Sequence, residues 1–277
     1  MSSILATHRQ ACGLAITLLT RLSVPTPPRP TPEVLGRTPL YYPWIGLLVG
    51  LFPVLSILLF ETLFSTLSPA VVAAVTLSLW VWISGGLHLD GLADCADAWT
   101  GGMGSRKRTL EILKDPRSGP HAVVAVVLLL LLKFSLLQAV ITADSPHLPT
   151  LSLIIAAAVA GRSAMTLLMI TLPYVRPGGM GSSACEQLSS EAAWWSLSLL
   201  LVAMLAWTAL TPESLITPWI VPAAVLTALF FGVPLLANSF RQRLGGITGD
   251  TLGAACEVIE LLTLLLGLCY ATLGSGV

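Results

Sequence analysis

The chain has 277 residues, of which 55% are hydrophobic and 10% charged, and its mean hydropathy is +0.85. Soluble domains carry roughly 25% charged residues, so this chain cannot cover a fully water-facing surface. Fourteen basic and fourteen acidic residues give a formal net charge of zero. Nucleic-acid binding needs a basic surface, so the charge balance argues against nucleic acid as a partner. The composition indicates a polytopic membrane protein.

An α-helix crosses the hydrocarbon core of a bilayer with about 20 apolar residues. Seven stretches have that length and character, and the alternating pattern of an outer-membrane strand is absent. We therefore predict an all-α, polytopic bundle with spans over 44–65, 69–87, 121–142, 149–173, 192–210, 218–238 and 251–273. Before them, Thr7–Leu22 is predicted to be an amphipathic or partly inserted helix rather than a signal peptide, because no small-residue cleavage site follows it. An irregular proline-rich linker over 23–32 comes next.

Basic residues predict the orientation of the bundle. With seven spans, the loops 66–68, 143–148 and 211–217 and the tail 274–277 lie on one side and contain no basic residue. Twelve of the fourteen basic residues lie on the other side: Arg9, Arg21, Arg29, Arg37, Arg106, Lys107, Arg108, Lys114, Arg117, Arg176, Arg241 and Arg243. The positive-inside rule assigns this side to the cytoplasm, with the N-terminus inside and the C-terminus outside.

The first acidic segment is SGGLHLDGLADCAD over 84–97. Asp90, Asp94 and Asp97 follow i, i+4, i+7 spacing, so their carboxylates share one helical face. Three unpaired carboxylates that close together repel one another, and a divalent cation held by oxygen ligands, Mg²⁺ or Mn²⁺, relieves the repulsion. His88 precedes them by two residues and is a candidate for proton transfer. The alternative is an acidic, solvated helix end.

Basic residues follow between Gly101 and His121. The glycines and the Arg106–Arg108 triplet suit phosphate recognition, because a guanidinium matches phosphate oxygens. Lys114, Asp115 and Arg117 form a second charged turn. Ordinary positive-inside anchoring is the alternative explanation.

The second acidic segment, RLGGITGDTLGAACEVIE, begins the last span. Asp250, Glu257 and Glu260 are spaced i, i+7, i+10 and share a face. A charge inside the bilayer costs at least about 2.5 kcal/mol, so Glu257 and Glu260 should line a polar cavity or pair with Lys133 or Arg162. We favour the cavity, with the ion pair as the alternative.

Two other features of the sequence carry less information. Arg176 lies in a glycine-rich loop that either contacts phosphate or connects two helices. The five cysteines are odd in number and lack CxxC spacing, which predicts packing residues rather than disulfides or a zinc site.

Five segments together resemble the cobalamin synthase family: AITLLTRLSVP, YYPWIGLLVG, GGLHLDGLADCADAW, RTLEILKDPRSGPH and GGITGDTLGAACEVIE. They occur in the expected order through nearly the whole chain. The departures are RLSVP in place of RIPVP or RLPVP, Cys95 in place of Thr, and SGPH after KDPR, which leaves the role of His121 open. The resemblance implies one membrane-embedded catalytic domain over 1–277, with a juxtamembrane segment over 1–43 and a cytoplasmic active-site segment over 85–120.

The resemblance also implies the activity: joining adenosylcobinamide-GDP to α-ribazole or its 5′-phosphate, with release of GMP, at the bacterial inner membrane and with Mg²⁺. In this reading Asp90, Asp94 and Asp97 hold one or two Mg²⁺ ions. Catalytic roles are expected for His88, Asp90, Asp94, Lys114 and Arg117. Substrate-binding roles are expected for Arg106, Asp115, Arg162, Arg176, Asp250, Glu257 and Glu260. Further partners considered are the lipid bilayer, a second copy of the chain and other cobalamin-assembly enzymes.

Two alternatives remain at this point. A CDP-alcohol phosphotransferase also places aspartates on membrane helices. Its DGxxAR pattern is not present here, because the DGLAD segment has Asp94 where that pattern would continue with Arg. A transporter also carries intramembrane charges. The densest charge here lies at predicted span ends, however, and no repeated halves are visible.

Overall fold

The computed structural model describes residues 2–142, 148–176, 178, 180–210 and 217–274. The helices in chain order are α1 Ser2–Leu19, α2 Pro32–Arg37, η1 Thr38–Tyr41, α3 Tyr42–Leu63, α4 Pro69–Ile83, α5 Leu87–Gly101, α6 Arg106–Ile112, α7 Pro120–Thr142, α8 Leu148–Thr171, α9 Met180–Gln187, α10 Ser190–Leu210, α11 Thr217–Thr227, η2 Ala228–Gly232, α12 Val233–Leu244 and α13 Gly249–Gly274. Here η1 is a 3₁₀ turn and η2 is a π-helical turn.

The predicted all-α bundle is confirmed. Over the described ranges, five helical segments are long and apolar enough to cross a membrane alone, or up to seven if each of two bent helix pairs forms one span. Six of the seven predicted spans coincide with one helix or with the α11–η2–α12 run, and the exception is the span 69–87. Most of the predicted outer loops, 143–148 and 211–217, and of the tail 274–277 lies outside the described residues.

The predicted span 69–87 differs from the structure. Helix α4 ends at Ile83, and α5 then starts at an angle of 89° to it. The break falls at Gly85 and Gly86, whose φ angles of 69° and 72° lie in the left-handed region that side chains disfavour. The apolar run therefore ends in a sharp turn, and α5, with its three aspartates, leaves the direction of α4.

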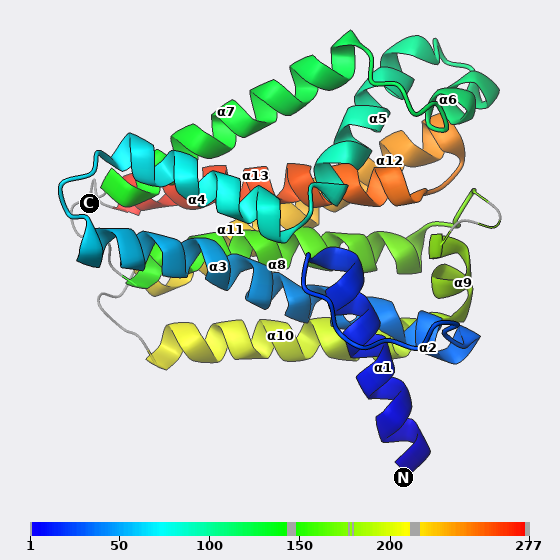
Figure 1. Ribbon diagram of the computed structural model, residues 1–277, viewed down its shortest axis with the longest axis horizontal. Coiled ribbons are helices and arrows are strands. Elements are labelled where there is room, and N and C mark those ends of the chain that lie inside the picture. Colours follow the sequence, from blue (N-terminus) through cyan, green and yellow to red (C-terminus); the bar gives the residue numbers. More distant parts are fainter. Residues whose placement is uncertain (1, 143–147, 177, 179, 211–216, 275–277) are drawn as a thin grey trace.

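The centre of the bundle is formed by α8 and α13, with α3, α4 and α7 around them (Figure 1). Close packing of α3 on α8 depends on Gly46 and Gly50, because a Cβ at either would lie 2.7 or 2.6 Å from the α8 backbone at Val159 and Ile155. This four-residue glycine spacing is typical of helix pairs in membranes. Large apolar side chains stay exposed on the outer helices, as expected for contact with lipid.

The two ends of the bundle differ. The connections α5–α6–α7, α8–α9 and α12–α13 lie at one end, and the α3–α4 connection lies at the other with the C-terminus (Figure 1). The basic residues between α5 and α7, in the loop after α8 and in the last turn of α12 therefore share one end, as the charge distribution predicts.

Candidate active site

A cavity of about 720 Å³ opens where α5, α8 and α13 meet α1, the start of α3 and the loop before α9. Four charged side chains line it: Asp90, Lys114, Arg176 and Asp250. His88 also lines it. These residues come from four separate parts of the sequence, and the structure brings them to one place.

Glycines make the close contact between the two acidic segments. A Cβ on Gly91 of α5 would lie 2.6 Å from the carbonyl oxygen of Asp250, and one on Gly253 of α13 would lie 3.1 Å from the Cα of His88. The two backbones touch, so Asp90 and Asp250 reach the same cavity.

Two loops are tied together beside the cavity. Val175 N donates to Ile247 O, and Ile247 N donates to Pro173 O, each at 2.9 Å. This pairing places Arg176 near Asp250, with 3.4 Å between Nη1 and Oδ2. Thr248 and Thr251 cap α13 with reciprocal hydrogen bonds of 2.8 and 3.3 Å. The loop that carries Arg176 is thus held against the start of α13.

Three other carboxylates lie near Asp94. Asp94 itself is on α5, which is not one of the five helices long enough to cross a membrane alone. Burial, followed by the charges of Asp90, Asp250 and Asp97, raises the pKa of Asp94 to about 6. The predicted mutual repulsion of the α5 aspartates is therefore present, and Asp250 joins it from α13.

Asp97 faces a different element. Its Oδ2 accepts a hydrogen bond from Gly119 N, and its Oδ1 accepts one from Ala122 N at 3.0 Å. Both carboxylate oxygens thus satisfy backbone donors at the start of α7, as an N-cap does. Asp97 joins α5 to α7, and it lines a second cavity rather than the first.

The predicted metal ligands are Asp90, Asp94 and Asp97 of α5. Within the part of the chain that the structure describes, no group of three or more His, Cys, Asp or Glu side chains is arranged to hold a metal ion. Mg²⁺ binds through one or two carboxylates plus substrate phosphates more often than in an all-protein cage. Asp90 and Asp94, one turn apart on α5, fit that partial donor set, whereas both oxygens of Asp97 are already engaged.

The second cavity, of about 330 Å³, lies between α5 and the loop before α7. Asp115, Arg117 and His121 line it. Arg117 binds Asp115 through two side-chain hydrogen bonds of 2.8 and 2.9 Å. These bonds hold the pKa of Asp115 down at about 2. The structure therefore separates this pair from Lys114, which lines the larger cavity.

Arg106 also lies apart from the larger cavity. Its guanidinium carbon is 3.0 Å from the position of a Cβ on Gly245, the residue after α12. A cation there complements the negative end of the α12 helix dipole.

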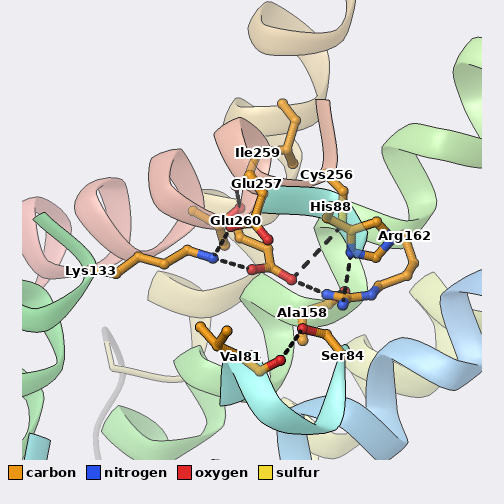
Figure 2. Close-up of polar contacts among 11 residues, drawn as sticks. Val81, Ser84, His88, Lys133, Ala158, Arg162, Cys256, Glu257, Ile259 and Glu260 are labelled. Carbon is orange, nitrogen blue, oxygen red and sulfur yellow. Dashed lines mark hydrogen bonds and ion pairs between the residues drawn. The ribbon is translucent and has the colours of Figure 1, made fainter. Parts of the chain in front are cut away.

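Four charged residues of the spanning helices form one buried network (Figure 2). Lys133 donates to Glu257 at 2.6 Å and also to Glu260, while Arg162 donates to Glu260 from the other side. All four side chains are buried, with exposed fractions of 6% or less. Two cations balance two anions, so the ion pairs that the sequence offered as the alternative are present. The favoured prediction, that Glu257 and Glu260 line a polar cavity, is wrong for the larger cavity, whose lining includes neither.

His88 connects the network to the cavity. Its Nδ1 lies 3.4 Å from Arg162 Nη2. Figure 2 shows the two side chains facing each other. Its Nε2 is buried, and no hydrogen-bond partner is found for it among the described residues. Nε2 of His88 is therefore available to form a hydrogen bond with another group.

Sequence reasoning missed the apolar residues of the cavity. Leu19, Tyr42, Met165 and Met169 line it although they lie in or beside apolar helices. No local signal separates them from other apolar residues of those helices, since only packing decides which of them face the cavity.

Comparisons with known proteins cover nearly the whole chain. The family model described as Cobalamin-5-phosphate synthase matches residues 11–268. An adenosylcobinamide-GDP ribazoletransferase of Pseudomonas putida is 46% identical over 264 residues, which cover 94% of this chain and 98% of that protein. Proteins of the same name from Ectopseudomonas mendocina and Pseudomonas aeruginosa are 46% and 44% identical, over 91% of this chain and 96% and 95% of theirs. No solved structure matches the chain.

Proposed function

Because this chain belongs to the cobalamin-5-phosphate synthase family, we propose that it joins adenosylcobinamide-GDP to α-ribazole, or to α-ribazole 5′-phosphate, and releases GMP. The product is adenosylcobalamin or its 5′-phosphate. The observation that carries the site assignment is the cavity in which Asp90 and Asp250 meet Lys114 and Arg176. Acidic and basic groups around one cavity suit a reaction between a diphosphate and a hydroxyl group.

In the proposed step, the ribose 3′-hydroxyl of α-ribazole attacks the phosphorus that carries the aminopropanol arm of the corrinoid. A new P–O bond forms, and the bond from that phosphorus to the bridging oxygen breaks, so GMP leaves with that oxygen. Asp250 takes the hydroxyl proton, because it lines the cavity and the α5 carboxylates serve the metal. Lys114 and Arg176 offset the charge on the diphosphate and on the departing GMP.

Mg²⁺ belongs to the proposal, with Mn²⁺ as a substitute. Asp90 and Asp94 would hold it together with diphosphate oxygens. When bound, the ion neutralises negative charge on the phosphates. His88 would donate a hydrogen bond from Nε2 to the substrate. Arg117 and Asp115 line the second cavity and would contact a part of the corrinoid that extends beyond the larger cavity.

The orientation is part of the same proposal. The site lies at the end of the bundle that carries the basic loops, so the positive-inside rule assigns it to the cytoplasmic face of the bacterial inner membrane. Both substrates would then enter from the cytoplasm.

The test uses the purified full chain in detergent with adenosylcobinamide-GDP, α-ribazole and Mg²⁺, and measures GMP release and corrinoid product. We expect turnover without a second compartment, loss of turnover with a chelator, and recovery with Mg²⁺ or Mn²⁺. Asp90→Asn should lower kcat at least 100-fold. Glu111→Gln is the matched control, since Glu111 is exposed and pairs only locally with Arg108.

Each result has a clear meaning. A wild-type chain that forms no product contradicts the activity. An Asp90→Asn variant that elutes and unfolds like the wild type and keeps near-normal Mg²⁺-dependent turnover contradicts the site.

A further inference from the structure

The larger cavity has two chemically different walls. Its charged groups come from α5, α13, the segment after α6 and the loop before α9. Helices α1, α3 and α8 contribute only apolar or aromatic side chains: Leu18, Leu19, Tyr42, Met165 and Met169. The one charged residue of α8, Arg162, is held in the buried network with Glu260 and lies outside this lining.

The side chains of the apolar wall are packed against the protein, and a small part of each faces the cavity. Leu19 is 1% exposed, and Tyr42, Met165 and Met169 are 5% exposed each. Met165 and Met169 are one turn apart on α8, so they present two thioethers on the same face. Thioethers adapt their shape and make favourable contacts with aromatic rings, and a phenol ring packs well against another aromatic group. This wall suits a flat, weakly polar aromatic ring.

The proposed reaction brings three ring systems to the site, and the wall fits one of them. Guanine has several donors and acceptors along its edges, and burying each without a partner costs about 1–3 kcal/mol. The corrin ring carries polar amides around its rim and needs partners in the same way. The base of α-ribazole, a dimethyl-substituted benzimidazole, has mostly carbon along its edges.

We propose that Tyr42, Met165 and Met169 form the binding site for the benzimidazole base of α-ribazole and contribute to the choice of base. The inference rests on the proposed function. It places the base against α3 and α8 and turns the ribose toward the charged wall of α5 and α13, where the diphosphate of the other substrate lies.

The first test separates the two substrates by their KM values. Met165→Ala and Met169→Ala each remove an apolar contact, so each should raise KM for α-ribazole about ten-fold. KM for adenosylcobinamide-GDP should change less than two-fold. Met169→Leu keeps volume and apolar character and should stay within three-fold of the wild type. Met204→Ala is the matched control, because Met204 lies on α10 and does not line the cavity.

The second test uses only the wild-type chain and so does not depend on how a variant folds. Removing both methyl groups of the base, in α-linked benzimidazole riboside, should lower kcat/KM about ten-fold. With an α-linked adenine riboside, kcat/KM should fall further, because the polar edge of adenine would face the apolar wall.

The outcomes distinguish this inference from the proposed function. An equal rise of both KM values, a selective rise for the corrinoid substrate, or equal use of all three ribosides overturns the base site while product still forms. A wild-type chain that does not use α-ribazole at all overturns the proposed function. A selective rise for α-ribazole together with the ranking of ribosides supports the base site.

Discussion

Glu260 accepts hydrogen bonds from both Lys133 and Arg162 inside the bundle. Removing one partner of a buried pair leaves an uncompensated charge, which costs about 3–5 kcal/mol. The network is neutral only with both glutamates ionised, so its stability depends on the charge sum as well as on each contact.

We therefore expect Glu260→Gln to lower the unfolding free energy by about 3 kcal/mol, since it leaves two buried cations facing Glu257 alone. The double variant Lys133→Met/Glu260→Gln restores neutrality and should recover more than half of the loss. Unfolding in detergent, followed by circular dichroism, measures both. A double variant as unstable as the single one would contradict the charge argument.

The carboxyl group of Asp94 makes the folding stability of the chain depend on pH. Its pKa is about 6 in the folded chain, above the ordinary 3.8 of an aspartate. Such a group is harder to ionise in the folded state than in the unfolded one, so folding stability falls as the pH rises between these two values. The cause is burial together with the charges of Asp90, Asp250 and Asp97.

In metal-free buffer, Asp94→Asn should therefore unfold at a higher temperature than the wild type at pH 7, and at nearly the same temperature at pH 4. Differential scanning fluorimetry across this range measures the difference, with Glu111→Gln as control. A difference that does not change with pH would show that Asp94 acts through something other than its charge.

At the scale of elements, the site depends on how closely α5 and α13 approach. Gly91 allows the Asp250 backbone to touch α5, and Gly253 allows the His88 backbone to touch α13. Asp97 fixes the start of α7 to the same helix α5. Helix α5 is thus held on two sides, and the distance between Asp90 and Asp250 follows from backbone contact.

Gly91→Ala should separate these helices, because its Cβ would meet the carbonyl oxygen of Asp250 at 2.6 Å. We expect a loss of stability of about 1–3 kcal/mol and at least a ten-fold loss of kcat/KM. Gly13→Ala, whose Cβ would make ordinary contacts of 3.5 Å or more, is the control and should leave activity intact. Equal activity of the two variants would contradict the close-contact argument.

At the scale of the whole molecule, charge is distributed by end. The segment between α5 and α7, the loop after α8 and the last turn of α12 carry basic residues and lie at one end of the bundle (Figure 1). The cavity with Lys114 and Arg176 opens among them. The apolar outer surface of α7 and its neighbours suits a lipid environment. The fold thus separates a lipid-facing body from a polar, substrate-binding end.

This arrangement predicts the topology. A reporter that is active only outside the cytoplasm should be active when fused after Ser65, in the α3–α4 connection, and inactive when fused after Gly104, between α5 and α6. A cytoplasmic reporter should give the reverse pattern at the same two sites. Identical activity at both sites would contradict the seven-span arrangement.

The approximate positions and order of the long apolar helices could be predicted from the sequence, because hydropathy and helical periodicity are local properties of the chain. The short helices α2, α6 and α9 were not predicted. The same local rule placed Asp90, Asp94 and Asp97 on one face and identified Glu257 and Glu260 as costly inside a span. The sharp turn at Gly85 and Gly86 was not predicted, since hydropathy indicates where an apolar run ends but not the direction in which the chain continues.

Only the tertiary structure decided what each charge contacts. Asp97 caps α7, Asp250 joins the α5 carboxylates, and Glu257 and Glu260 pair with Lys133 and Arg162. Periodicity alone put Asp250 and both glutamates on one face and could not separate their roles. The cations that pair with them lie 74 to 127 positions away in the sequence. The contacts therefore depend on helix packing, to which the close approach at Gly91 and Gly253 contributes.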